Sequence, residues 1–306
     1  MPPLLRTVVA LFFVSLPTIT FADVLSVHSV ARGIWAIAGP AEQRDAKNLG
    51  NNATFGLIET TEGAVLIDAG GTWAGAAMLH DRVKELTDQP VVYVINSGGQ
   101  DHRWLGNGYW KAQGATIVAS ADAVADQQDR GSLQLTMLSQ LVGDGLKGTS
   151  PTYADVTFET DHVVDLGGRR IEIHHAAAAH TPGDSFVWLP QDSTVFTGDI
   201  VYVGRVLGVM FFSDSASWLE AFSAIEALNP TYLVPGHGPA TTLERAQADT
   251  RDYLNNLRVQ MRTYIDEGGD ITGSVEVDQS DFAYLDQFDA LARRNAQAVY
   301  EQMEWE

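Results

Sequence analysis

Two successive blocks of strand-like sequence, each followed by helix-like sequence, constrain the fold of this chain more than any other feature. In the first block, GIWAIA, ATFGLIET and GAVLIDAGG are apolar runs bounded by glycine, and VVYVIN and ATIVAS continue the pattern. The second block contains ADVTFE, HVVDLG, RRIEIHHA, SFVWLP and STVFTGD, which alternate in strand fashion and end at Gly or Pro. The order predicts an α/β fold in which two sheets pack face to face with helices outside, in a single domain.

Helix-like segments separate these strands and close the chain. Apolar residues recur at helical spacing over residues 73–86, 121–146 and 215–228. The region from about 243 to 306 is also helix-like, at 243–268 and 281–304, so we expect a helical C-terminal extension. With 45% hydrophobic residues among 306, the chain is long enough for one large core.

The first 22 residues have the layout of a secretory signal peptide. MPPLLRTVVALFFVSLPTITFA carries one Arg, an apolar run from Thr7 to Leu16 and small residues before Asp23. The run is shorter than the roughly 20 residues of a membrane span, although an uncleaved anchor is the alternative. We therefore expect the domain to cover residues 23–306 and to be periplasmic or secreted, with no membrane insertion after cleavage.

Charge and cysteine content narrow the classes of partner and ligand. The chain has 39 Asp and Glu against 19 Lys and Arg, a net charge of −20, which repels nucleic acid and anionic lipid. We expect a small-molecule substrate and no nucleic-acid partner. Cysteine is absent, so disulfides are excluded and any metal must be held by His, Asp or Glu.

Residues with metal-binding chemistry stand where predicted strands end. Asp101 and His102 follow VVYVIN, His180 follows RRIEIHH, Asp199 ends VFTGD and His237 lies in LVPGHG. Taken singly, a His beside a turn is more often structural, and an Asp at a strand end often caps backbone N–H groups. Five such residues at strand-to-loop junctions indicate a common site.

The order and spacing of these motifs resemble those of the metallo-β-lactamase superfamily over nearly the whole chain after residue 22. That family has a four-layer αββα sandwich and separated motifs: an early Asp, H-x-H-x-D-H, a His, a bridging Asp and a last His. LIDAGG, HTPGD, FTGD and PGHG supply Asp68, His180, Asp199 and His237. The resemblance implies that the last three bind metal, whereas Asp68 holds the ligand loops by hydrogen bonds.

The stretch NSGGQDHRWLGN departs from the family's H-x-H-x-D-H motif. Ser97 and Gly99 stand where the family has its first two His. Gly99 offers no ligand atom, and a serine hydroxyl is a poor zinc ligand. The second metal site of the family keeps two carboxylates and two imidazoles: Asp101, His102, Asp199 and His237. The resemblance therefore implies one zinc ion per chain, with iron or manganese as the other possible metals.

One bound zinc ion is enough for hydrolysis, because it lowers the pKa of a bound water from about 15.7 toward about 7. Asp101 would orient or deprotonate that water, and His180 would contact the developing oxyanion. The resemblance thus implies a zinc-dependent hydrolase that cleaves an ester, thioester or amide (lactam) bond. A catalytically inactive metal- or ligand-binding protein on the same fold is the alternative, and an iron-dependent oxygenase is a third reading.

Looser similarities concern the branch of the family and individual side chains. Three segments resemble the sequences of exported metallohydrolases associated with quinoprotein and sulfur-oxidation systems. They are NLGNNATFGLIETTEGAVLIDAGGT, FSDSASWLEAF and PGHGPATT. This implies a link to a periplasmic system of that kind. Tyr202 is expected to line a pocket or to belong to the core. Arg103 is expected to pair with one of the many surface acids.

Overall fold

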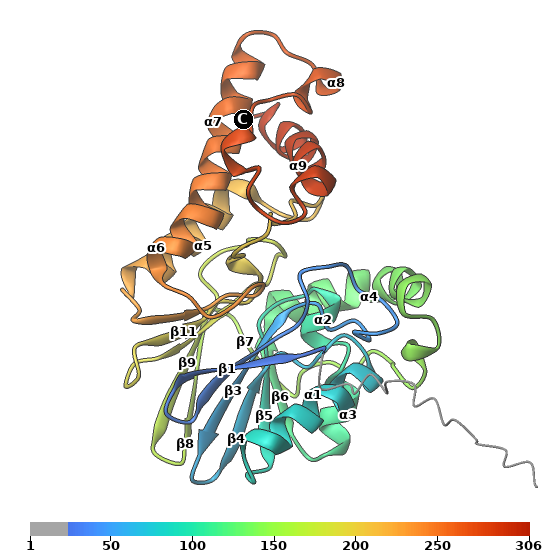
Figure 1. Cartoon of the computed structure of the whole chain (residues 1–306), viewed down its shortest axis with the longest axis vertical. Coiled ribbons are helices and arrows are strands. Elements are labelled where there is room, and N and C mark those ends of the chain that lie inside the picture. Colours follow the sequence, from blue (N-terminus) through green and yellow to red (C-terminus); the bar gives the residue numbers. More distant parts are fainter. Residues whose placement is uncertain (1–23) are drawn as a thin grey trace, which may run out of the picture.

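In the computed structural model, residues 24–306 are described, and they form two β-sheets packed face to face between layers of helices (Figure 1). The seven-stranded sheet runs in chain order through β1 (Ser26–Ala31), β2 (Ile34–Ala38), β3 (Thr54–Thr60), β4 (Gly63–Ile67), β5 (Val91–Asn96), β6 (Thr116–Ser120) and β7 (Val156–Phe158). The five-stranded sheet has the order β12 (Tyr232–Val234), β11 (Thr194–Phe196), β10 (Phe186–Leu189), β9 (Arg169–His174) and β8 (Asp161–Leu166). The predicted signal peptide of residues 1–22 lies outside the described residues.

Helices follow the strands of each half, and several of them begin at a side chain that caps the first turn. In the first half these are α1 (Trp73–Leu86), α2 (Asp101–Trp104), α3 (Asn107–Ala112) and α4 (Ala121–Val142). In the second half they are α5 (Ser215–Ala227), α6 (Leu243–Ala246), α7 (Asp252–Asp266), α8 (Ile271–Ser274) and α9 (Phe288–Met303). Thr72, Ser120 and Asp214 each accept a backbone N–H of the first turn, at α1, α4 and α5 respectively, which satisfies donors that have no partner within the helix.

Successive side chains along a strand point to opposite faces of its sheet, and this explains how each sheet packs against the other sheet on one face and against helices on the other. In β10, the side chains of Val187 and Leu189 enter the core between the two sheets, whereas Phe186 and Trp188 pack on the opposite side against the helices of the second half. The same period of two is expected for any strand buried on both faces. The four-layer αββα arrangement expected from the sequence is therefore confirmed.

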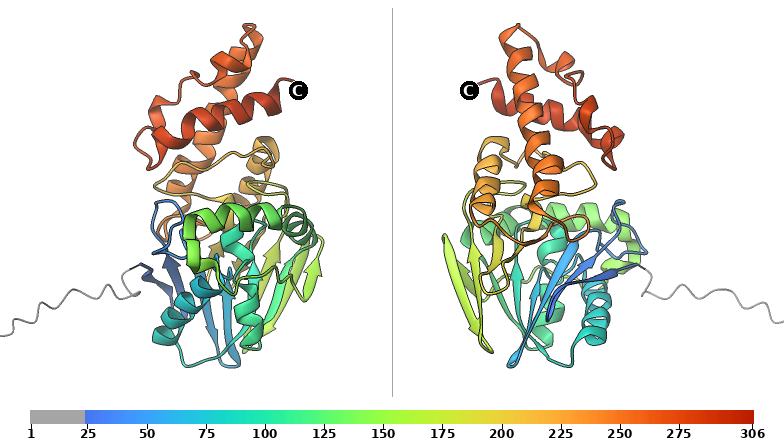
Figure 2. Two further views of the ribbon diagram at one scale, coloured as in Figure 1. Left: turned by 90° about the vertical axis from the view of Figure 1, so that its right-hand side faces the viewer. Right: turned by 60° about the vertical axis from the view of Figure 1, so that its left-hand side comes forward.

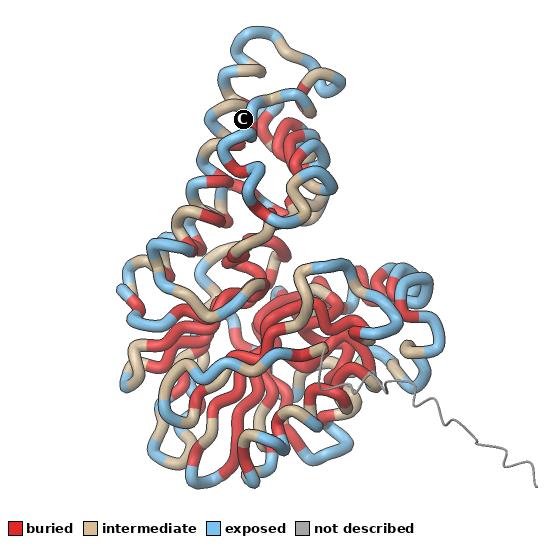
Figure 3. Tube along the Cα trace, in the orientation of Figure 1, coloured by how far each residue is buried: buried red, intermediate tan, exposed pale blue. Residues whose placement is uncertain are grey.

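The C-terminal helices form a lobe that stands on one end of the sandwich (Figures 1 and 2). Trp218 of α5, Leu257 of α7 and Val299 of α9 belong to the same buried cluster as Trp188 of β10. Red, buried segments accordingly continue from the sheets into α7 and α9 (Figure 3). No helix between residues 24 and 306 has the length and apolar character needed to cross a membrane.

Candidate metal centre

The functional side chains come from loops at the ends of neighbouring strands. Asp68 follows β4, residues 97–102 follow β5, Asp199 follows β11 and His237 follows β12. Strands β4 and β5 are parallel, as are β11 and β12, so the loops after each pair emerge at the same edge. Residues more than 130 positions apart thereby meet at one edge of the sandwich.

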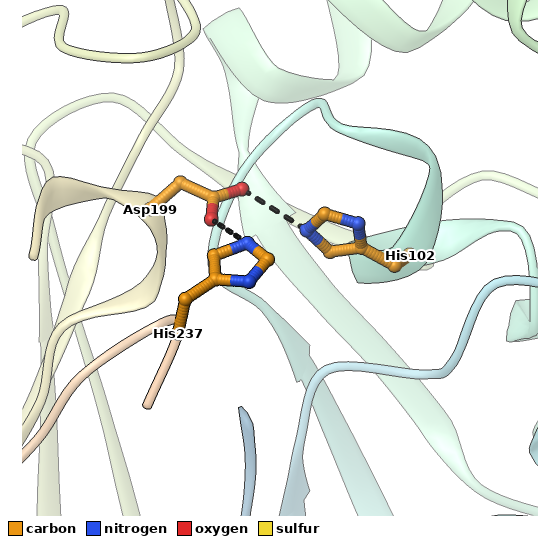
Figure 4. A group of neighbouring side chains, drawn as sticks. All are labelled: His102, Asp199 and His237. Atoms are coloured by element: carbon orange, nitrogen blue, oxygen red, sulfur yellow. Dashed lines mark hydrogen bonds and ion pairs between the residues drawn. The ribbon is translucent and has the colours of Figure 1, made fainter. Parts of the chain in front are cut away.

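Three of the predicted ligands meet in the interior. One ligand atom each from His102, Asp199 and His237 lies within 4.8 Å of the others, and all three residues are buried. The Nε2 atom of His102 is 3.3 Å from Oδ2 of Asp199, and the Nε2 atom of His237 is 3.1 Å from Oδ1. Both imidazoles point toward the carboxylate (Figure 4). Their rings are edge to face, with centroids 5.1 Å apart.

The hydrogen bonds of His237 show which ring nitrogen is free to bind a cation. Its Nδ1 atom lies 2.9 Å from the carbonyl oxygen of Asn52, which can only accept, so Nδ1 carries the proton. Burial lowers the pKa of His237 well below its usual value, so the ring is neutral and Nε2 presents a lone pair. That lone pair faces an oxygen of Asp199, and two acceptors at this distance repel each other unless a cation compensates them.

The donor set fits a divalent metal ion. Two imidazole nitrogens and one carboxylate oxygen match the composition of catalytic zinc sites, which leave a fourth position for water. The carbonyl of Asn52 supplies the outer hydrogen bond that fixes the orientation of a ligating imidazole. His102, Asp199 and His237 are therefore the residues that would hold the ion.

Asp101 has its own partner in the structure. Its Oδ1 atom accepts two hydrogen bonds from the Arg44 guanidinium, at 3.0 and 2.8 Å, and lies 3.3 Å from Nδ1 of His102. Burial alone would raise the pKa of Asp101, but Arg44 and His102 hold it well below its usual value. Its Oδ2 atom has no partner among the described residues, and its roles as ligand and base stay predictions.

His180 lies beside the centre and outside the three-residue group. Its Nδ1 atom is 2.8 Å from the carbonyl oxygen of Gly208, so this nitrogen carries the proton. Burial lowers the pKa of His180 to about 4, so the ring is neutral at neutral pH and Nε2 is an acceptor. In this tautomer the ring cannot donate to an oxyanion, which is the role that the sequence suggested for it.

Arg103 corrects an expectation drawn from the sequence. Instead of pairing at the surface, its side chain is fully buried and lies between two carboxylates of the site. Its Nη2 atom is 2.7 Å from Oδ1 of Asp199, and its Nη1 atom is 2.7 Å from Oδ2 of Asp68. Burial alone would raise the pKa of Asp199, but Arg103 and His102 hold it well below its usual value. Asp199 is thus ionised, and its charge is shared with an internal cation.

Asp68 lies outside the three-residue group and contacts the loop that follows β5. Its backbone φ of +69° is unusual for a non-glycine residue. Its carboxylate accepts hydrogen bonds from the backbone N–H and the hydroxyl of Ser97, at 2.7 and 2.9 Å, as well as from Arg103. The Ser97 hydroxyl is therefore directed at Asp68.

The space beside Gly99 is filled by another ion pair. A Cβ atom on Gly99 would overlap the carboxylate of Asp126 on α4, which pairs with Arg130 one turn later. A larger side chain at residue 99 therefore requires the Asp126 side chain to move, which would disturb its ion pair with Arg130.

Tyr202 is a pocket residue that the sequence left undecided between pocket and core. Its ring stacks on His237, with centroids 4.6 Å apart and planes 16° from parallel. Burial raises the pKa of its hydroxyl well above the usual value, so the hydroxyl remains a donor. It has no hydrogen-bond partner among residues 24–306, and it lines the cavity next to the centre together with His102 and His180.

Comparisons with known proteins agree with this architecture. The family model for the metallo-beta-lactamase superfamily matches residues 50–237, more than half of the chain. A metallo-beta-lactamase from Pontibacter korlensis is 24% identical with a TM-score of 0.61, covering 76% of this chain and 99% of that one. FIM-1 from Pseudomonas aeruginosa, solved in a mono-zinc form, is 18% identical with a TM-score of 0.58, covering 74% and 93%.

One curated relative matches a smaller region. The "Beta-lactamase-like protein 2 homolog" of Caenorhabditis elegans is 26% identical over 113 residues, which are 37% of this chain and 35% of that protein. The match thus spans about a third of the length of the curated relative.

Proposed function

Because the chain belongs to the metallo-beta-lactamase superfamily, we propose that it is a zinc-dependent hydrolase with one metal ion held by His102, Asp199 and His237. The observation that carries this proposal is the pair of facing acceptors, Nε2 of His237 and Oδ1 of Asp199, 3.1 Å apart in the interior. The guanidinium of Arg103 compensates the Asp199 carboxylate from one side, and the lone pair on Nε2 of His237 faces that carboxylate without a proton or cation between them. A metal ion would supply that cation and retain the outer hydrogen bond to Asn52.

The bound zinc ion would polarise a substrate oxygen and make hydroxide available at neutral pH. The protein's own groups would position the reactants. Oδ2 of Asp101, which has no described partner, is the acceptor we assign to orienting the attacking water. The Tyr202 hydroxyl, kept protonated by its raised pKa, is the donor we assign to the developing oxyanion. Nε2 of His180, an acceptor, would orient the substrate's polar group.

The bond attacked is an ester, thioester or amide carbonyl, the class open to a single metal-activated water. We further propose that the protein is exported by its N-terminal segment, which makes it periplasmic or secreted. Its motifs resemble those of metallohydrolases associated with quinoprotein or sulfur-oxidation systems, and we propose a role beside such a system.

One observation favours the alternative of a catalytically inactive binding protein. Arg103 donates to both oxygens of Asp199, with Nε 3.2 Å from Oδ2 and Nη2 2.7 Å from Oδ1. This cation already compensates part of the charge that would attract a metal ion. Metal content and turnover, measured together, therefore separate the two candidates.

The deciding experiment is the metal content per chain, by mass spectrometry of protein purified without chelator or affinity metal. Close to one zinc per chain, together with turnover of a panel of esters, thioesters and lactams, is the expected result. Failure to bind zinc after it is added back would overturn the hydrolase proposal in favour of the binding protein.

A further inference from the structure

A cavity of about 200 Å³ lies directly over the candidate metal centre. His102, His180 and Tyr202 form its floor, and His237 connects it to an adjoining cavity of about 230 Å³. Cavities with convergent polar groups next to a reactive centre are where small ligands bind. The shape and charge of its walls therefore bear on the substrate.

Part of the cavity wall comes from outside the segment that matches the family model. Residues 50–237 match, yet Arg44 precedes that segment and both Leu291 and Arg294 of α9 follow it. The C-terminal lobe thus contributes directly to the cavity. Specificity in this protein accordingly depends on helix α9 as well as on the loops of the sandwich.

Three arginines, Arg44, Arg205 and Arg294, reach the cavity in a chain that has about two acidic residues for each basic one. Arg44 is compensated by Asp101 at 2.8 Å. Arg205 and Arg294 form no salt bridge with any carboxylate of residues 24–306. Arg294 is exposed to solvent, whereas Arg205 is partly buried, so Arg205 is the guanidinium group whose lack of an ion-pair partner points to a ligand.

One hydrogen-bond donor of the Arg205 guanidinium has no acceptor among the described residues. Its Nη1 atom donates to the carbonyl of Ala41 at 3.0 Å, but its Nε atom is buried without any hydrogen-bond partner in the described chain. Burial, together with the nearby Arg44, lowers the pKa of Arg205 despite attraction from Asp199 and Asp286. A buried donor without an acceptor costs free energy, and an anion from solution would supply the acceptor.

The cavity lining also includes apolar side chains. Met137 of α4, Met210 and Leu291 of α9 line the cavity. Met137 is 54% exposed, and Phe211, which follows Met210 in the chain, is 76% exposed. Apolar surface therefore continues from the cavity lining to the outside of the protein. A ligand that matches this lining carries both an anionic group and a hydrocarbon portion.

We propose that this cavity binds a substrate that carries a carboxylate group, held between Arg205 and Arg294, with its hydrocarbon portion against Met137, Met210 and Leu291. The inference rests on the proposed hydrolase function and specifies its substrate class: an ester, thioester or amide of an acid that has a second, free carboxylate. Helix α9 is the specificity wall, and Arg294 is its charged residue.

The test compares substrates that differ only in charge. Mono-4-nitrophenyl esters of succinic, glutaric, adipic and suberic acid are compared with the 4-nitrophenyl esters of neutral acids of the same chain length, using zinc-loaded full-length protein. We expect kcat/KM to be at least about tenfold higher for the best half-ester than for its neutral counterpart, as for other charge-assisted contacts. A neutral ester that equals or exceeds every half-ester would overturn the proposal.

Variants identify the residues responsible. Arg205→Gln and Arg294→Gln should each remove most of the preference for the half-ester, measured as the ratio of kcat/KM for the half-ester to kcat/KM for the neutral ester of the same chain length. Arg294→Glu should invert the preference. Arg293→Gln is the matched control, because the neighbouring Arg293 is exposed and paired with Glu276 at 2.7 Å, away from the cavity. An equal effect of the Arg293 and Arg294 variants would show that only overall charge matters.

A binding measurement separates this proposal from the hydrolase proposal. If no ester is hydrolysed, the hydrolase proposal fails, and titration calorimetry with the four dicarboxylates and their diamides still tests the cavity. Binding of a dicarboxylate that is lost in Arg205→Gln and Arg294→Gln, with no binding of the diamide, supports it. Absence of dicarboxylate binding to the wild-type protein at millimolar concentration overturns it.

Discussion

Replacement of Arg103 by Met tests whether the internal cation holds the site together. The guanidinium makes five hydrogen bonds, to both oxygens of Asp199, to Asp68 and to the carbonyls of Thr54 and Gly236. These equal the five N–H donors of an arginine. Met fills a similar volume without the charge, so the variant leaves two buried carboxylates and two carbonyls without this donor.

The Arg103→Met variant should lose much of its unfolding free energy, because Arg103 and the carboxylates that it contacts are all buried. Removal of one partner from a buried ion pair costs about 3–5 kcal/mol of unfolding free energy. This is a substantial part of the roughly 5–15 kcal/mol that stabilises a typical protein. Arg293→Met is the control, since the Arg293–Glu276 pair is exposed and solvent-screened, and exposed pairs contribute at most about 1 kcal/mol.

The loss of unfolding free energy in Arg103→Met should also depend on pH. The protonation of Asp199 and Asp68 determines whether the loss grows or shrinks as the pH falls. In the wild type, Arg103 helps to hold the pKa of Asp199 below its unfolded value. That contribution is present above the unfolded pKa and is lost as the pH falls through the folded pKa. In the variant, protonation of Asp199 and Asp68 relieves the uncompensated charge. The difference in unfolding free energy between the wild type and Arg103→Met should therefore be greatest near neutral pH and should decrease as the solution is acidified.

Urea denaturation of EDTA-treated protein, followed by tryptophan fluorescence at several pH values, measures the loss of unfolding free energy and its dependence on pH. Asp68→Asn introduced into the Arg103→Met background should recover part of the loss, because it removes one of the orphaned charges. A destabilisation below about 1 kcal/mol that is also independent of pH would refute the reasoning, since it would mean that water or a rearranged loop replaces the guanidinium.

Three further predictions concern the centre itself. His237→Ala should weaken zinc binding by more than about 100-fold in a calorimetric titration, because loss of an outer partner alone costs about 10–100-fold; His180→Ala should leave it nearly unchanged, and equal losses would make His180 a ligand. Gly99→Ala should destabilise the protein by about 1–3 kcal/mol through overlap with the Asp126 carboxylate, and an unchanged urea midpoint would show that the Asp126 side chain turns away without cost. Tyr202→Phe should lower kcat by about 100-fold with zinc content preserved, and an unaltered kcat would remove Tyr202 from the role of oxyanion donor.

The order of strands and helices could be predicted from the sequence because its signals are local. Period-two alternation in segments such as SFVWLP, Gly and Pro at strand ends, and capping residues such as Thr72 depend on a few neighbouring positions. The same signals place His102, Asp199 and His237 at strand ends. Parallel pairing of β4 with β5 and of β11 with β12 then brings the loops together at one edge.

The partners within the site were decided by the tertiary structure. Asp101 meets Arg44 across 57 positions of sequence, and Arg103 meets Asp199 across 96. Nothing in the sequence around Arg103 distinguishes it from a surface arginine, because its burial follows from the convergence of three loops. The position of Arg294 over the centre likewise depends on how α9 packs on the sandwich. Local sequence determined which groups stand at strand ends, whereas long-range packing determined which charges compensate one another, since electrostatic partners are chosen by distance in space and by burial.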